Sequence, residues 1–83
     1  MMGDGERLKR MGRLEENKLQ AREAEIRMQG LVESLREHLD PFEKLDELNT
    51  DLIASQALEL ARLKIDYTGL LDSIRAIEKA LGR

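Results

Sequence analysis

Apolar residues recur every three or four positions over the last third of the chain, and this repeat constrains the fold more than any other feature. The series is unbroken through Leu60, Leu63, Tyr67, Leu70, Ile74, Ile77 and Leu81. Alternating spacings of three and four place such residues along one stripe of an α-helix, at the a and d positions of a heptad repeat. A stripe of this kind is buried only when another helix covers it. The sequence therefore predicts a long helix that packs against a second helix.

A weaker repeat earlier in the chain supplies that second helix. Its apolar members lie seven apart or between those positions, and they are Leu14, Ala21, Ala24, Met28, Leu31, Leu35, Phe42 and Leu45. Asn17 and His38 interrupt the stripe, and no proline occurs before Pro41. We predict a first long helix over residues 6–39, preceded by a disordered N-terminus over residues 1–5, which holds two glycines and no periodicity.

The tetrapeptide Asp40-Pro41-Phe42-Glu43 separates the two repeats. Aspartate is a good helix N-cap, and proline suits the first helical position. A glutamate three residues after the aspartate completes a capping box. Asp40, Pro41 and Glu43 therefore predict a capped bend over residues 40–43, and a second long helix over residues 41–82 that stops at Gly82. A later break at Asn49-Thr50-Asp51 is the alternative, because all three residue types favour caps.

These elements predict an all-α fold in which two long helices form an antiparallel helical hairpin, or coiled coil, within a single domain. Counting across the bend places Leu35 opposite Leu45 and Leu14 opposite Tyr67. The predicted intrachain seam comprises Leu35, Leu45, Leu60, Leu63, Tyr67, Leu70, Ile74 and Ile77. A single long kinked helix is the alternative, because a connection between packed helices usually needs about 2–8 residues.

The composition agrees with long helices. Charged residues make up 37% and hydrophobic residues 41% of the 83 residues, and Phe42 and Tyr67 are the only aromatic residues. This balance is typical of coiled coils and not of a compact core. The chain has no cysteine, so it forms no disulfide. It also has no uncharged run near the roughly 18 apolar residues that a membrane span needs. We therefore expect a cytoplasmic protein that has no contact with membranes.

A second apolar stripe lies in the middle of the predicted second helix. Ala54, Leu58, Ala61 and Ile65 follow one another at spacings of four, three and four, at b and f positions roughly opposite the seam. One hairpin partner covers only one side of a helix, so this stripe needs another cover. We predict that the stripe is a self-association or partner face, and that two copies form a dimeric four-helix bundle with the second helices at its centre.

No residue pattern predicts catalysis, a cofactor or a metal site. His38 is the only histidine, and no cysteine accompanies it as a transition-metal ligand. The acidic stretch Asp46–Asp51 lacks the central glycine and the closing glutamate of a calcium loop. None of the serines has a base partner that would activate it. We therefore predict a non-catalytic protein that works by binding helices.

The sequence leaves three other kinds of partner open. A regulatory adaptor or chaperone would use the same apolar stripe to bind another protein's amphipathic helix. A minor nucleic-acid accessory factor would use the N-terminal basic cluster, but acidic neighbours and an acidic chain make nucleic acid an unfavourable partner. Residues 33–51 carry seven acidic and two basic side chains, which suits a solvated tip or a docking site for a basic partner. The basic cluster consists of Arg7, Lys9, Arg10 and Arg13.

Overall fold

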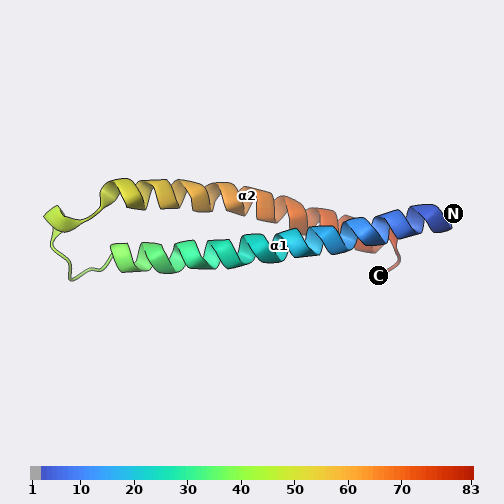
Figure 1. The fold of residues 1–83 in the computed structure, drawn as a ribbon, viewed down its shortest axis with the longest axis horizontal. Coiled ribbons are helices and arrows are strands. Elements are labelled where there is room, and N and C mark those ends of the chain that lie inside the picture. The colour runs from blue at the N-terminus through green and yellow to red at the C-terminus, as the bar shows by residue number, and fades with distance from the viewer. Residues whose placement is uncertain (1–2) are drawn as a thin grey trace.

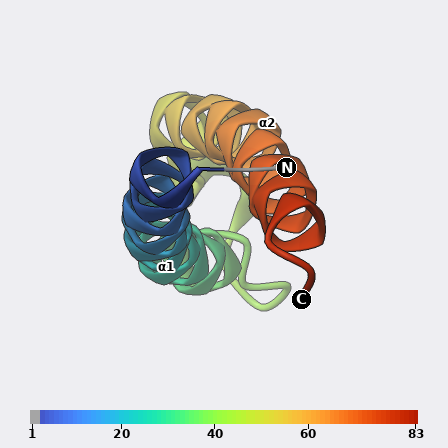
Figure 2. The same cartoon turned by 90° about the vertical axis from the view of Figure 1, so that its right-hand side faces the viewer.

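The computed structural model describes residues 3–83, which form two antiparallel helices joined at one end (Figure 1). Helix α1 spans Asp4–His38 and helix α2 spans Thr50–Ala80, with a short 3₁₀ helix η1, Leu45–Glu47, between them. The hairpin measures 63 × 15 × 15 Å, and Figure 2 shows the two helices twisting around each other. The predicted all-α helical hairpin is confirmed, and the alternative of one long kinked helix is wrong.

Helix α1 begins two residues before the predicted start. Gly3 is its N-cap, and Asp4 and Glu6 lie in the first turn, where carboxylates interact favourably with the positive end of the helix dipole. The prediction of disorder over residues 1–5 is therefore wrong for Asp4 and Gly5, while residues 1–2 lie outside the described part of the chain. The helix ends at His38, one residue before the predicted end.

The connection between the helices differs from the predicted bend. The Asp40 carboxylate accepts a hydrogen bond from the Phe42 backbone N–H at 2.9 Å, and the Glu43 N–H donates to the Asp40 carbonyl at 3.2 Å. These bonds close a turn, and the chain is extended again at Lys44, with ψ 136°. The prediction that Asp40, Pro41 and Glu43 cap a helix starting at residue 41 is wrong.

The second helix begins instead at the site that was the alternative. Asn49 is the N-cap of α2, and its side-chain oxygen accepts from the Leu52 N–H at 3.2 Å. Packed helix axes lie about 8–10 Å apart, and the loop must span that distance while the chain reverses. A helix ending at residue 39 and another starting at residue 41 leave too little chain for this. The longer connection, residues 39–49, provides enough chain to reverse direction between the packed helices.

Replacing Asn49 with alanine is expected to lower the free energy of unfolding by about 0.5–2 kcal/mol, because the helix loses its cap acceptor. Asp40→Ala removes a turn hydrogen bond in an exposed loop and should cost clearly less. Urea denaturation followed by circular dichroism measures both variants. If Asp40→Ala is the more damaging change, then the helix starts at residue 41 in solution.

Helix α2 ends at Ala80, two residues before the predicted end, and the predicted stop residue Gly82 follows it. Gly82 adopts a left-handed conformation, with φ 78°, which residues with a Cβ adopt only at a cost. The Arg83 N–H then reaches back to the Glu78 carbonyl at 2.9 Å, and the Gly82 N–H donates to the Lys79 carbonyl at 3.1 Å. These bonds satisfy carbonyl groups of the last turn that would otherwise lack a donor.

The tightest packing lies at the end of the hairpin away from the loop. The buried cluster consists of Leu14, Ala21, Ile74, Ile77 and Leu81, with Tyr67 and Leu70 packed against it. Nearer the loop only Leu31 is buried. The remaining predicted seam residues within the helices, Leu35, Leu60 and Leu63, are half-buried. Two helices alone therefore cover this seam only in part.

The predicted register and one seam residue are wrong. Leu45 lies in η1 and is 84% exposed, so it does not face Leu35 across the seam. Counting across a tight bend places residue 17 opposite residue 64. The structure instead joins Asn17 to Ser73 by a hydrogen bond of 2.8 Å. The long loop accounts for this shift, because it delays the start of α2 by nine residues.

Candidate interaction surface

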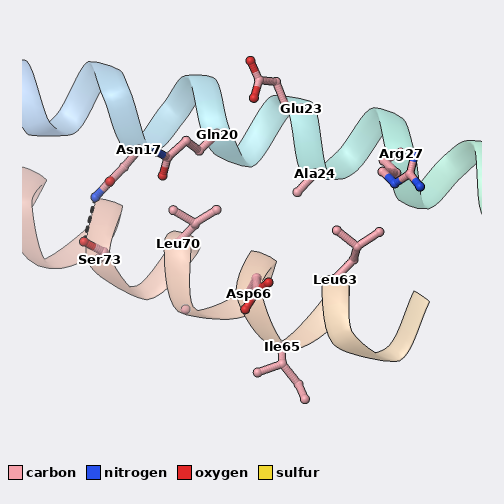
Figure 3. Close-up of a pocket in the computed structure, with 11 residues that line it drawn as sticks. Asn17, Gln20, Glu23, Ala24, Arg27, Leu63, Ile65, Asp66, Leu70 and Ser73 are labelled. Atoms are coloured by element: carbon pink, nitrogen blue, oxygen red, sulfur yellow. Dashed lines mark hydrogen bonds between the residues drawn. The ribbon is translucent and has the colours of Figure 1, made fainter. Parts of the chain in front are cut away.

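The α2 outer face consists of Ala54, Leu58, Ala61 and Ile65, the stripe that the sequence analysis identified. All four residues are exposed in the hairpin, with Leu58 54% and Ile65 73% accessible. Figure 3 shows the Ile65 side chain pointing away from α1, whereas Leu63 and Leu70 point toward it. Two large aliphatic side chains one heptad apart, with Ala61 between them, form a surface into which the side chains of another helix can pack.

Polar contacts across the seam fix how the two helices are aligned. The Asn17 amide donates to the Ser73 hydroxyl at 2.8 Å, as the dashed line in Figure 3 shows. Ten residues along α1, the Arg27 guanidinium donates to the Glu59 carboxylate. Asn17 interrupts the apolar repeat in the sequence, and the structure shows that this interruption has a hydrogen-bonding partner in α2.

A shallow groove of about 670 Å³ runs along the side of the hairpin that carries these contacts. The Ser73 hydroxyl faces the amide of Asn17, which is not a base and cannot remove its proton. Within this groove, the Ser73 hydroxyl therefore has a hydrogen-bond donor as its neighbour and not a base. It is lined by Asn17, Gln20, Glu23, Ala24, Arg27, Leu63, Ile65, Asp66, Gly69, Leu70 and Ser73.

The N-terminal basic cluster does not form an isolated basic face. Arg7, Lys9 and Arg13 are exposed, whereas Arg10 is half-buried. Arg10 and Arg13 line a recess with Ile77 and other residues near the end of α2. Arg10 and Arg13 therefore lie beside the best-packed end of the hairpin.

The structure also reveals exposed apolar residues that the sequence analysis missed. Leu19 is 53% and Ile26 64% exposed on α1. Their spacing of seven residues was the available signal, but the pair lies among charged residues and does not extend into a longer repeat. Phe42 is exposed in the loop, although it belongs to the apolar heptad repeat of the sequence.

The described residues offer few other kinds of site. Within residues 3–83, no group of three or more His, Asp or Glu side chains is placed to hold a metal ion. Neither helix of this part of the chain is long and apolar enough to cross a membrane. Comparison with known proteins gave no matching family, no matching curated protein and no matching solved structure.

Proposed function

We propose that the chain is a non-catalytic helical interaction protein that self-associates through the α2 outer face. The observation that carries this proposal is the exposure of Leu58 and Ile65, one heptad apart on α2, with Ile65 pointing away from α1 in Figure 3. Full burial of a large aliphatic side chain contributes roughly 1.5–3 kcal/mol. A second copy of the chain is the partner always present at the same concentration.

The partly covered seam supports the same proposal. Leu60 and Leu63 are only half-buried within one hairpin, and a chain of 83 residues has a small core for its length. Contact with another copy would add apolar burial that two helices alone do not provide. Folding and association would then be coupled, so the stability of the protein would rise with its concentration.

The test is the mass of the protein in solution. A single chain has a mass of 9.5 kDa. We expect sedimentation equilibrium to give a larger mass at about 100 μM, a concentration that saturates any contact with a Kd near 1 μM. The melting temperature should rise over the same range of concentration. A 9.5 kDa species throughout would contradict self-association, and the α2 outer face would then be assigned to another protein's amphipathic helix.

A further inference from the structure

The outer side of α1 carries an apolar pair that matches the α2 outer face in spacing. We call Leu19 and Ile26 the α1 outer pair; they are 53% and 64% exposed and one heptad apart. Leu58 and Ile65 are also one heptad apart, so both pairs repeat over about 10.5 Å of helix. Leu19 and Ile26 occupy f positions relative to the buried Leu14 and Ala21, and therefore lie on the side of α1 turned away from α2.

The charges around the two surfaces have opposite signs. Four exposed glutamates and two exposed arginines, Arg22 and Arg27, surround the α1 outer pair, so acidic side chains are in excess there. Two exposed bases, Arg62 and Lys64, and one exposed acid, Asp66, flank the α2 outer face, so bases are in excess there. Within residues 3–83, ion pairs join Lys18 to Glu78, Arg27 to Glu59 and Arg75 to Asp72. The glutamates and the two bases therefore have no ion-pair partner in their own hairpin. The four glutamates are Glu15, Glu16, Glu23 and Glu25.

We propose that the α1 outer pair of a second copy covers the α2 outer face, with the two contacting helices antiparallel. This assignment rests on the proposed self-association and names the surface of the second copy that takes part. The small side chain of Ala61 leaves a hole between Leu58 and Ile65, and Ile26 of the second copy fills it.

The charged residues then meet in pairs. With Ile26 of the second copy level with Ala61, its Glu23 lies within about 3 Å of Arg62 along the helix axis. Its Glu25 lies equally close to Lys64. In an antiparallel pair, equivalent heptad positions face each other, and Glu23 shares position c with Arg62 while Glu25 shares position e with Lys64. Each base therefore gains an acidic partner that its own hairpin does not supply.

The same alignment already occurs inside the hairpin. Asn17 lies opposite Ser73 and Arg27 opposite Glu59, which places Ile26 close to the level of residues 60–64. A second copy in the proposed contact therefore lies beside the first at the same height, pointing the same way. By contrast, a symmetric contact between two α2 outer faces would bring Arg62 and Lys64 of both copies along one interface, and like charges oppose that arrangement.

The two surfaces lie on opposite sides of the molecule. Leu19 and Ile26 occupy f positions of α1, and Leu58 and Ile65 occupy f positions of α2, so each pair lies on the side turned away from the other helix. Figure 3 shows this orientation for Ile65. A contact between unlike surfaces leaves one free surface at each end, so association does not stop at two copies. The expected product is a lateral row of hairpins, and its mean mass should keep rising with concentration.

Two variants, each lacking one surface, test the assignment. Leu19→Gln with Ile26→Gln removes the α1 outer pair, and Leu58→Gln with Ile65→Gln removes the two large residues of the α2 outer face. We expect each variant alone to remain a 9.5 kDa single chain. An equimolar mixture should form a complex of two chains and no larger species, because each variant keeps the surface that the other lacks. Leu8→Gln with Leu45→Gln is the matched control, since it changes two exposed leucines outside both surfaces and should associate like the parent.

The outcomes separate the two proposals. If the parent is a single chain at about 100 μM, self-association fails, and this assignment fails with it. If the parent associates but Leu19→Gln with Ile26→Gln associates equally well, self-association stands and the assignment of α1 is wrong. Circular dichroism checks that each variant keeps the helicity of the parent.

Charge reversal gives a second test that leaves every apolar residue in place. Glu23→Arg with Glu25→Arg, and Arg62→Glu with Lys64→Glu, should each weaken association at least tenfold when measured alone. Mixing the two variants should restore association, because reversed charges then meet reversed charges. A mixture that associates no better than its components would contradict the proposed pairing of the charges.

Discussion

Replacing Leu14 with alanine is expected to remove a large part of the free energy of unfolding of the protein. Leu14 is the one large side chain in residues 3–83 that is fully buried. A buried leucine-to-alanine change costs about 2–5 kcal/mol, because transfer free energy is lost and a cavity remains. Domains of ordinary size have only about 5–15 kcal/mol of stability, and a two-helix protein belongs at the lower end of that range.

Leu45→Ala is the matched control for this prediction, because it makes the same substitution at a site that is 84% exposed. It should change the free energy of unfolding by less than about 0.5 kcal/mol. Thermal and urea denaturation, followed by circular dichroism at 222 nm, compare the two variants. If they are equally stable, then the cluster around Leu14 is not the core of the protein in solution.

The combined change of Leu58 to glutamate and Ile65 to lysine is expected to abolish self-association while the hairpin stays folded. Both residues lie outside the intrachain seam, and the pair of changes leaves the net charge unaltered. Losing the burial of two aliphatic side chains removes roughly 3–6 kcal/mol from one interface. Since each 1.4 kcal/mol is a factor of ten, the Kd should rise by about two to four orders of magnitude.

Leu63→Glu places a charge in the seam and is the comparison for this result. Leu63 is half-buried and points toward α1, so its replacement by glutamate should lower helicity at every concentration. The variant changed at Leu58 and Ile65 should instead keep its helicity. Only the mass of the species in solution should fall, to that of a single chain, as measured by sedimentation equilibrium. If both variants lose helicity equally, then the outer face and the seam are not separate surfaces.

The heptad pattern predicted the hairpin and most of its seam, because periodicity reports which side of a helix is covered whatever its partner is. It failed at Leu45, where the count was carried through residues that are not helical. The capping signature at Asp40 misled for a related reason. An aspartate followed by proline satisfies its hydrogen bond equally well in a turn, and only the space required to reverse the chain decides between turn and helix.

The candidate surface was predicted in part. The stripe from Ala54 to Ile65 stood out because four apolar residues follow helical spacing on a side the seam does not use. Leu19 and Ile26 did not stand out, since each is isolated among charged residues. Their proposed role in association depends on which neighbouring charges remain unpaired after the hairpin forms. The alignment of the two helices decides this, and the sequence alone does not give that alignment.

The hydrogen bond between Asn17 and Ser73 also helps to choose one alignment from several that the repeat allows. A seam that repeats every seven residues is nearly degenerate, since sliding one helix by a heptad again brings apolar residues together. One slip would place Asn17 opposite Asp66, a suitable acceptor, but would leave Arg27 opposite Leu52.

The opposite slip would give Arg27 an acidic partner in Asp66, but would place Asn17 opposite Ala80. Each slipped state gives one of the two α1 side chains a new polar partner and leaves the other without one, whereas the observed alignment gives both a partner. Leaving the half-buried Asn17 amide unpaired costs about 1–3 kcal/mol, whereas the exposed pair of Arg27 and Glu59 contributes at most about 1 kcal/mol. Two modest contacts, placed ten residues apart on α1, therefore remove the ambiguity that a regular apolar repeat creates.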